Sequence, residues 1–312
     1  MPDPLVYLQA TGVAAIVSAL IVLMVARQRL LVENHRWDAA NCVALGLGLA
    51  VGGQLLAQRI AWPPASGLDR FLVIIIPALL GIEFIAAAQS IPARLTWILR
   101  LSLAAAVPRI LLHDSVYLSG PTAWTIWHSL LILSLGSLLL ASVWLLLVRL
   151  FERSADASIP LSLSVAILGA GLSVMMAGYI KGGATAFLLV SVLVATTFAT
   201  RVTRNRQAPV ILGIGVVSLF SVLFIGTFFG RLPLDRAFAL GLAPLLCWAT
   251  EWKRSSDRNG WFVGLIRLML IAIPVIVVLI LMKRDFDRNI APLLGGVQIN
   301  VSNLKIEKVT ER

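Results

Sequence analysis

Two glutamate–arginine pairs lie inside long apolar stretches of this chain, where charged side chains are costly and therefore candidates for a function. The first is Glu83 with Arg100, and the second is Glu251 with Arg267 at nearly the same spacing. Glu83 lies about 10 Å from the cytoplasmic end of one expected helix, and Arg100 about 9 Å into the next. Antiparallel neighbours could therefore join them as an ion pair. Glu251 is followed by a tryptophan and two basic residues, which indicates a position closer to water.

These pairs admit two interpretations. A buried ion pair can fix the register of a helix hairpin without taking part in chemistry, and we favour this interpretation for the pairs taken alone. The functional interpretation is that the four side chains line a polar path that binds an ion or an anionic group. A dry, sealed hairpin would support the first interpretation, and a water-filled cavity beside Glu83 or Arg100 would support the second.

A second group of polar residues follows the first pair, toward the opposite end of the same expected helix. Arg109 and His113 are four residues apart and thus share a helical face, and Asp114 is adjacent. A histidine titrates near neutrality and could sense the pH outside the cell. We favour the simpler interpretation, a hydrogen-bonded polar cluster at the membrane surface.

Several patterns that would indicate an enzyme are absent from the sequence. It contains no His-Glu-x-x-His, no Gly-x-Ser-x-Gly, no phosphate-binding Walker loop and no Cys-x-x-Cys. Three scattered histidines do not build a common metal centre, and Cys42 and Cys247 both fall within apolar stretches. We therefore expect no catalytic residues, metal or cofactor, and predict that the protein is not an enzyme.

The elements that carry these residues are expected to be membrane-spanning helices. Of 312 residues, 59% are hydrophobic and only 13% are charged, which is outside the range of soluble domains. Apolar stretches near the ~20 residues needed to cross a bilayer recur along the chain. The sequence predicts an all-α, multi-pass bundle of about ten spans: 5–25, 39–57, 71–90, 96–113, 125–149, 158–180, 184–200, 209–229, 235–250 and 261–282.

An internal repeat organises these spans. Five landmarks recur at an offset of 166 to 168 residues: Asp69 with Asp235, Pro77 with Pro244, Glu83 with Glu251, Arg100 with Arg267, and Pro108 with Pro274. Spans one to four thus resemble spans seven to ten. A displacement of six spans is even, so the repeat is parallel, with both copies entering the membrane from the same side.

The repeat divides the chain into four parts. We expect a first transmembrane repeat over 1–124, a linking helix pair over 125–183 and a second repeat over 184–282. The remaining tail, 283–312, is expected outside the cytoplasm. Alternation of apolar and polar residues around Val297, Ile299 and Val301 indicates a short β-hairpin there.

The distribution of basic residues predicts the orientation. The net charge is +11, but the charges lie in short links, which favours membrane topology over nucleic-acid binding. Alternate links carry 13 lysines and arginines on one side and five on the other. By the positive-inside rule both termini lie outside the cytoplasm, and we expect a cytoplasmic (inner) membrane protein.

Two functions are favoured, and an intramembrane enzyme acting on lipid ranks third. Duplication favours a carrier or permease-like subunit for an unidentified solute, with the two pairs as its polar elements. The alternative is a structural or assembly subunit of a membrane complex, without transport or catalytic activity. Its partners would be the lipid bilayer and either other membrane proteins or further copies of itself.

Overall fold

A computed structural model describes residues 4–27, 34–56, 62–87, 91–119, 123–154, 156–203, 209–252 and 260–289. Within these ranges every regular element is a helix and no strand occurs, so the expectation of an all-helical bundle is confirmed. The residues of the expected β-hairpin lie outside the described ranges. The last helix continues to Asn289, beyond the end at 282 that the sequence indicated for the final span.

Seven of the described helices are long and apolar enough to cross a membrane, and they make this a multi-pass membrane protein. They are α1 (Pro4–Arg27), α5 (Ala93–Leu112), α6 (Ile126–Arg153), α7 (Ser158–Met176), α8 (Ile180–Val202), α9 (Pro209–Phe228) and α12 (Gly260–Asn289). A further long helix, α2 (Asn34–Leu55), begins with several polar residues.

Two helical stretches are interrupted near a proline. The first consists of α3 (Gly67–Arg70), the π-helical turn η2 (Phe71–Ile75) and α4 (Ile76–Ala86). The second consists of α10 (Leu234–Leu242), the 3-10 segment η3 (Ala243–Trp248) and α11 (Ala249–Trp252). Pro77 follows η2 closely and Pro244 lies within η3. Proline lacks the N–H that would bond to the preceding turn, and its ring crowds that turn, so the α-helical pattern breaks there.

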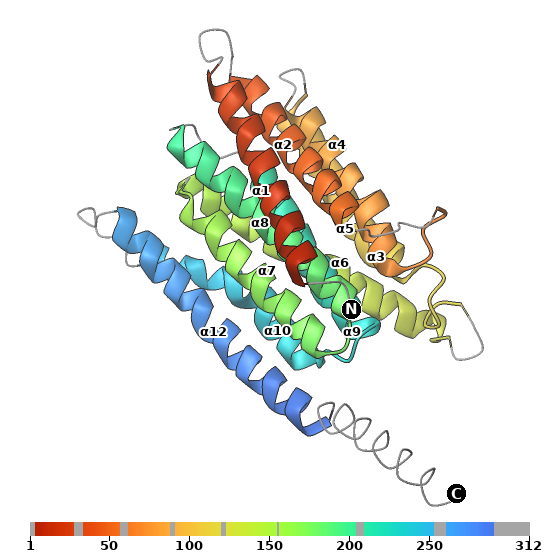
Figure 1. The fold of residues 1–312 in the computed structure, drawn as a ribbon. Coiled ribbons are helices and arrows are strands. Elements are labelled where there is room, and N and C mark those ends of the chain that lie inside the picture. The colour runs from red at the N-terminus through yellow and green to blue at the C-terminus, as the bar shows by residue number, and fades with distance from the viewer. Residues whose placement is uncertain are drawn as a thin grey trace, which may run out of the picture.

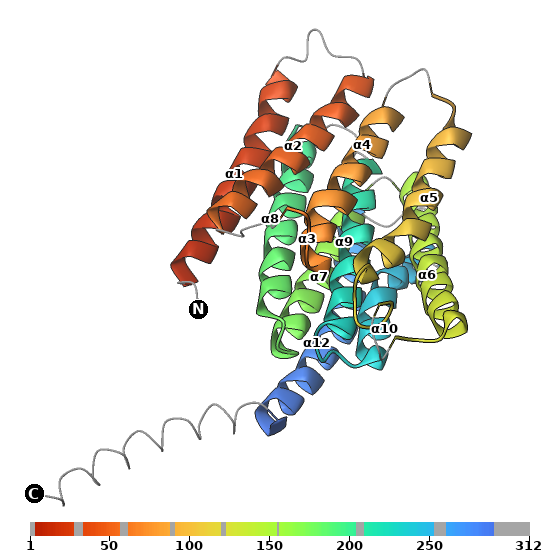
Figure 2. The ribbon, with the colours of Figure 1, turned by 90° about the vertical axis from the view of Figure 1, so that its right-hand side faces the viewer.

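The helices form one bundle around α9, in which nearly every residue from Val210 to Gly226 is buried. Figure 1 shows α12 along one edge of the bundle, while Figure 2 shows α1 and α2 at one side and α5 and α6 at the other. The first residues of α1 and the last of α12 lie toward the same end of the bundle. Most of the surface of α1, α6 and α12 is exposed and apolar, as expected of helices in contact with lipid.

Glycines allow α2 to pack closely against α1 and α8. A Cβ atom on Gly48 would lie 1.9 Å from Ser18 Oγ, and one on Gly52 would lie 2.8 Å from Ala14 Cβ and 2.2 Å from Leu188 Cδ1. The spacing of these glycines predicts close packing of helices in lipid, and the contacts confirm it. The hairpin of α7 and α8 uses the same device, because a Cβ on Gly171 would lie 2.6 Å from Ala186 Cβ.

Candidate functional site

Glu83 and Arg100 form a two-pronged ion pair between α4 and α5. Arg100 Nε donates to Glu83 Oε1 at 2.8 Å, and Nη2 donates to Oε2 at 2.6 Å. The side chain of Glu83 is only 3% exposed and that of Arg100 9%. This parallel geometry matches the guanidinium fork to both carboxylate oxygens, which is the strongest arrangement available to such a pair. The spacing in sequence that placed the two residues at one depth is thus realised as a direct contact.

The surroundings of this pair are closely packed and largely aromatic. The guanidinium carbon of Arg100 lies 5.4 Å from the centre of the Trp97 ring and 6.0 Å from that of Trp144. On the other side, α9 presents Gly213, where a Cβ would lie 3.3 Å from both Glu83 Oε1 and Trp144 Cζ2. Aromatic faces attract a cation, so the tryptophans stabilise Arg100 in its largely buried position. Side chains of α5 and α6 and the backbone of α9 therefore enclose the pair.

Glu251 and Arg267 form the second pair, between α11 and α12. Arg267 Nη2 lies 2.6 Å from Glu251 Oε1, and the side chains are 1% and 12% exposed for the arginine and the glutamate. The other bonds of Arg267 go to hydroxyl oxygens: Nε to Thr250 at 2.9 Å, Nη1 to Ser158 at 3.1 Å and Nη2 to Ser154 at 3.0 Å. One arginine thus ties together α11, α12, the start of α7 and the link that precedes it.

The two pairs are placed similarly on their helices, but their arginines have different bonding partners. In each, a glutamate near the end of an interrupted helix meets an arginine of the following helix. Arg100 is neutralised by a full carboxylate fork and aromatic faces, whereas Arg267 uses one carboxylate oxygen and three hydroxyls. All three guanidinium nitrogens of Arg267 are engaged. Binding a solute at either arginine would first require its present bonds to break, which is costly in a dry site.

The polar group of Arg109, His113 and Asp114 is exposed. His113 Nδ1 lies 3.1 Å from Asp114 Oδ2, with side chains 59% and 69% exposed, and Arg109 is exposed on α5. Asp114 adopts a positive φ of 50°, a left-handed conformation that aspartate tolerates better than most residues. The buried arginine in this region is Arg70, which donates to the backbone carbonyls of His113 and Ala65. Arg70 was only a link charge in the sequence, yet it fixes the end of α5 to α3.

Within the described residues, no three histidine, cysteine, aspartate or glutamate side chains come together to hold a metal. Cys42 and Cys247 are separate buried thiols.

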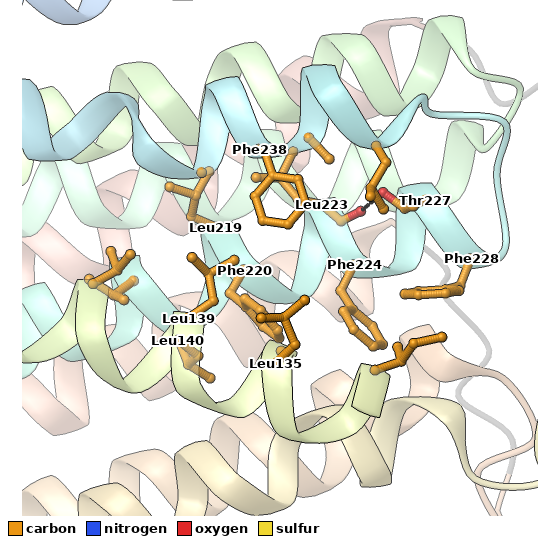
Figure 3. Close-up of a pocket in the computed structure, with 17 residues that line it drawn as sticks. Leu135, Leu139, Leu140, Leu219, Phe220, Leu223, Phe224, Thr227, Phe228 and Phe238 are labelled. Atoms are coloured by element: carbon orange, nitrogen blue, oxygen red, sulfur yellow. Dashed lines mark hydrogen bonds between the residues drawn. The ribbon is translucent and has the colours of Figure 1, made fainter. Parts of the chain in front are cut away.

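The structure also contains an apolar groove that the sequence did not indicate. It has a volume of about 250 Å³ and lies between α6, α9 and α10 (Figure 3). Phe220, Phe224 and Phe228 project into it from α9, and Phe238 from α10. The four glutamate and arginine residues of the two ion pairs are not among its lining residues. The candidate polar path and the groove are thus separate.

Sequence reasoning missed the partners that complete these sites. Trp144 lies five residues inside the end of the expected span 125–149, and that position gave only a weak signal that it serves something other than the membrane interface. Ser154, Ser158 and Thr250 carried no such signal, because hydroxyl residues are common near helix ends. The groove had a weak signal in the three phenylalanines spaced by four residues, which share one face of α9.

Comparison of the sequence with protein-family models and with curated proteins returned no match.

Proposed function

We propose that this protein is a structural or assembly subunit of a membrane complex, in which the two glutamate–arginine pairs lock the helix bundle. The observation that carries the proposal is the closed packing around Glu83 and Arg100, whose charged atoms are bonded to each other and enclosed by Trp97, Trp144 and Gly213. A carrier needs its polar residues to face a water-filled path. An ion pair that holds helices together needs its charged groups to be buried, bonded to each other and closely packed.

The proposed architecture has ten crossings of the inner membrane and a parallel repeat. To the seven apolar helices we add α2 and the two interrupted stretches, each about 28–33 Å long at 1.5 Å per residue. The repeat is supported by the matching order in the two copies. In each, a proline-interrupted stretch ends in the glutamate, and the next helix carries the arginine and then a proline.

A carrier is the second candidate, and one observation favours it. Proline-interrupted helices at corresponding positions of two repeats often form the substrate site of secondary transporters. Here the interruptions are η2 before Pro77 and η3 around Pro244. In a carrier of this design, the two pairs would open to water during each cycle of transport.

Cysteine accessibility separates the two functions without knowledge of a substrate. Thr96 is buried four residues before Arg100 on the same face of α5. In a background with Cys42→Ala and Cys247→Ala, Thr96→Cys is treated with a water-soluble maleimide in lipid nanodiscs. The matched control is His128→Cys, at an exposed position near the start of α6.

A structural lock predicts that Thr96→Cys stays unlabelled over hours while His128→Cys is labelled within minutes. A carrier predicts labelling of Thr96→Cys whenever the pair opens to water. Labelling of both positions at comparable rates in folded protein would therefore reject the structural proposal and support transport.

A further inference from the structure

We propose that the groove between α6, α9 and α10 is a binding site for the acyl chain of a membrane lipid. It is formed by Ile132 to Val143 of α6, Val216 to Phe228 of α9 and Leu234 to Gly241 of α10. α6 packs against α9 and also against η3, the segment that follows α10. α10 forms the third wall of the groove (Figure 3). Its floor is α9, which is one of the apolar helices at the centre of the bundle.

The length of the groove corresponds to one leaflet of a bilayer. Val216 to Phe228 covers about 18 Å of α9 at 1.5 Å per residue. The hydrocarbon core of a bilayer is about 30 Å thick, so one leaflet contributes about 15 Å. Phe228 is the last residue of α9 and Leu234 the first of α10, so the groove begins at one surface of the bundle and reaches to about its middle.

The lining selects an apolar ligand. The rings of Phe220 and Phe224 stack with centroids 5.3 Å apart, and those of Phe224 and Phe228 are 4.5 Å apart. Thr227 is the one residue among those lining the groove with a polar side chain, and its Oγ1 already donates to the carbonyl of Leu223 at 2.9 Å. A ligand that needed hydrogen bonds would leave its polar groups unpaired here, which is unfavourable. A hydrocarbon chain makes no hydrogen bonds and therefore loses none in the groove.

The groove has a volume of about 250 Å³. A single extended hydrocarbon chain is thinner than a helix, which is about 10 Å across with its side chains. The chain can follow the groove between α6, α9 and α10, whereas a transmembrane helix of a partner or of a second copy would lie over it. Because lipid and protein are equally apolar, shape and rigid ring faces would give the site its preference.

The end of the groove at the membrane surface suits a lipid headgroup. Phe228 contacts Trp124 and Tyr117, with ring centroids 5.7 and 5.6 Å away. Tyr117 also donates its hydroxyl proton to the carbonyl of Phe228 at 2.8 Å. Tyrosine and tryptophan concentrate at the depth of lipid headgroups. A chain that starts beside this aromatic cluster and runs along α9 would therefore keep its polar end at the surface.

Photolabelling tests the site with the whole 312-residue chain. The protein is placed in phosphatidylcholine nanodiscs that contain a trace of phosphatidylcholine with a diazirine in its acyl chain, irradiated and digested. Labelled residues are then mapped by mass spectrometry. We expect label on the groove-lining segments of α6 and α9 in clear excess over the exposed apolar face of α12, which contacts bulk lipid.

Two substitutions fill the groove and one serves as the control. A Cβ on Gly241 would contact Leu223 at 3.5 Å, so Gly241→Phe introduces its ring without a clash at the backbone. Leu139→Trp fills the groove from α6, in case the first variant fails to fold. Leu138→Phe places an aromatic ring at the neighbouring position, which is 65% exposed and does not line the groove.

Label in the groove should fall about tenfold in either filled variant and stay unchanged in Leu138→Phe. Uniform labelling of all exposed helices would overturn the proposal. Less lipid label on the groove segments than on the exposed face of α12 would also overturn it, because it would show that something other than lipid covers the groove.

Discussion

Arg100 and Arg267 show how a buried cation is accommodated in a membrane by two different sets of partners. Both are nearly inaccessible, and both depend on the planar, multi-donor shape of the guanidinium group. Arg100 is matched by one carboxylate and two indole faces. Arg267 is matched by hydroxyls from three segments and one carboxylate oxygen. In both cases the charge is neutralised locally, which is what a helix lock requires.

Removing one charge of the first pair should be far more damaging than removing both. Glu83→Gln leaves the Arg100 cation buried without its counterion, and we expect a loss of about 3–5 kcal/mol in the free energy of unfolding. The double variant Glu83→Gln with Arg100→Met removes the buried charge as well, and most of that loss should be recovered. Unfolding in mixed detergent micelles, followed by circular dichroism, measures both.

The control is Glu152→Gln at an exposed position near the end of α6, where we expect a change within about 0.5 kcal/mol. If the double variant is no more stable than Glu83→Gln alone, the pair contributes to stability through something other than its charges. The proposal that it acts as an ion-pair lock would then be wrong.

The spacing of charges in the sequence was sufficient to bring Glu83 to Arg100 and Glu251 to Arg267, because each pair lies on neighbouring helices joined by a short link. It was insufficient for Trp144 and Ser154, which reach their arginines from other parts of the chain. Contacts of that kind depend on how non-adjacent helices pack. Periodicity within one helix does not specify this packing.

At the scale of the elements, small residues determine how closely the helices approach. α2 contributes two glycine positions that differ sharply in their surroundings. A Cβ on Gly52 would overlap with Ala14 of α1 and Leu188 of α8, whereas one on the adjacent Gly53 would meet nothing within 4 Å. The sequence predicted the packing role of Gly48 and Gly52 from their spacing. It did not predict which neighbouring helices they contact.

Gly52→Ala should therefore destabilise the protein and Gly53→Ala should not. The methyl group at position 52 must push α1 and α2 apart, because Ala14 has no flexible side chain that could move away. We expect a loss of about 1–3 kcal/mol. At position 53 the better helix propensity of alanine should give a gain of up to about 1 kcal/mol. Detergent unfolding of the two variants measures the contrast, and equal effects would show that the α1–α2 contact is not tight.

The two helical stretches interrupted near Pro77 and Pro244 show how proline alters an element. Pro77 and Pro244 stand at equivalent places in the proposed repeat, yet one break is a π-helical turn before the proline and the other a 3-10 segment around it. Proline specifies that an α-helix cannot continue undisturbed, and its neighbours determine how the chain responds. The sequence predicted 71–90 and 235–250 as continuous spans, so neither the breaks nor their geometry were foreseen, although the two prolines mark where they occur.

At the scale of the whole molecule, the arrangement of the helices and the charges of the links together predict how the protein is oriented in the membrane. The start of α1 and the end of α12 lie toward one end of the bundle. The links at the opposite end are those expected to carry 13 of the lysines and arginines, a count that includes the buried Arg100, against five for the alternate links and six more in 283–312. Basic residues are retained on the cytoplasmic side of an inner membrane. Both ends of the chain should therefore lie outside the cytoplasm.

Reporter fusions in a bacterial host test this orientation. Alkaline phosphatase folds to its active form only outside the cytoplasm, where its disulfides form, so a fusion after Arg312 should be active. A fluorescent protein that matures only in the cytoplasm should stay dark at the same site. Fusions after Arg204, in the basic link between α8 and α9, should show the opposite pattern, since that link is expected inside. Bright fluorescence at Arg312 with active phosphatase at Arg204 would show that the protein has the opposite orientation in the membrane. The groove would then open to the inner leaflet, and the aromatic cluster of Tyr117, Trp124 and Phe228 would lie at the cytoplasmic surface.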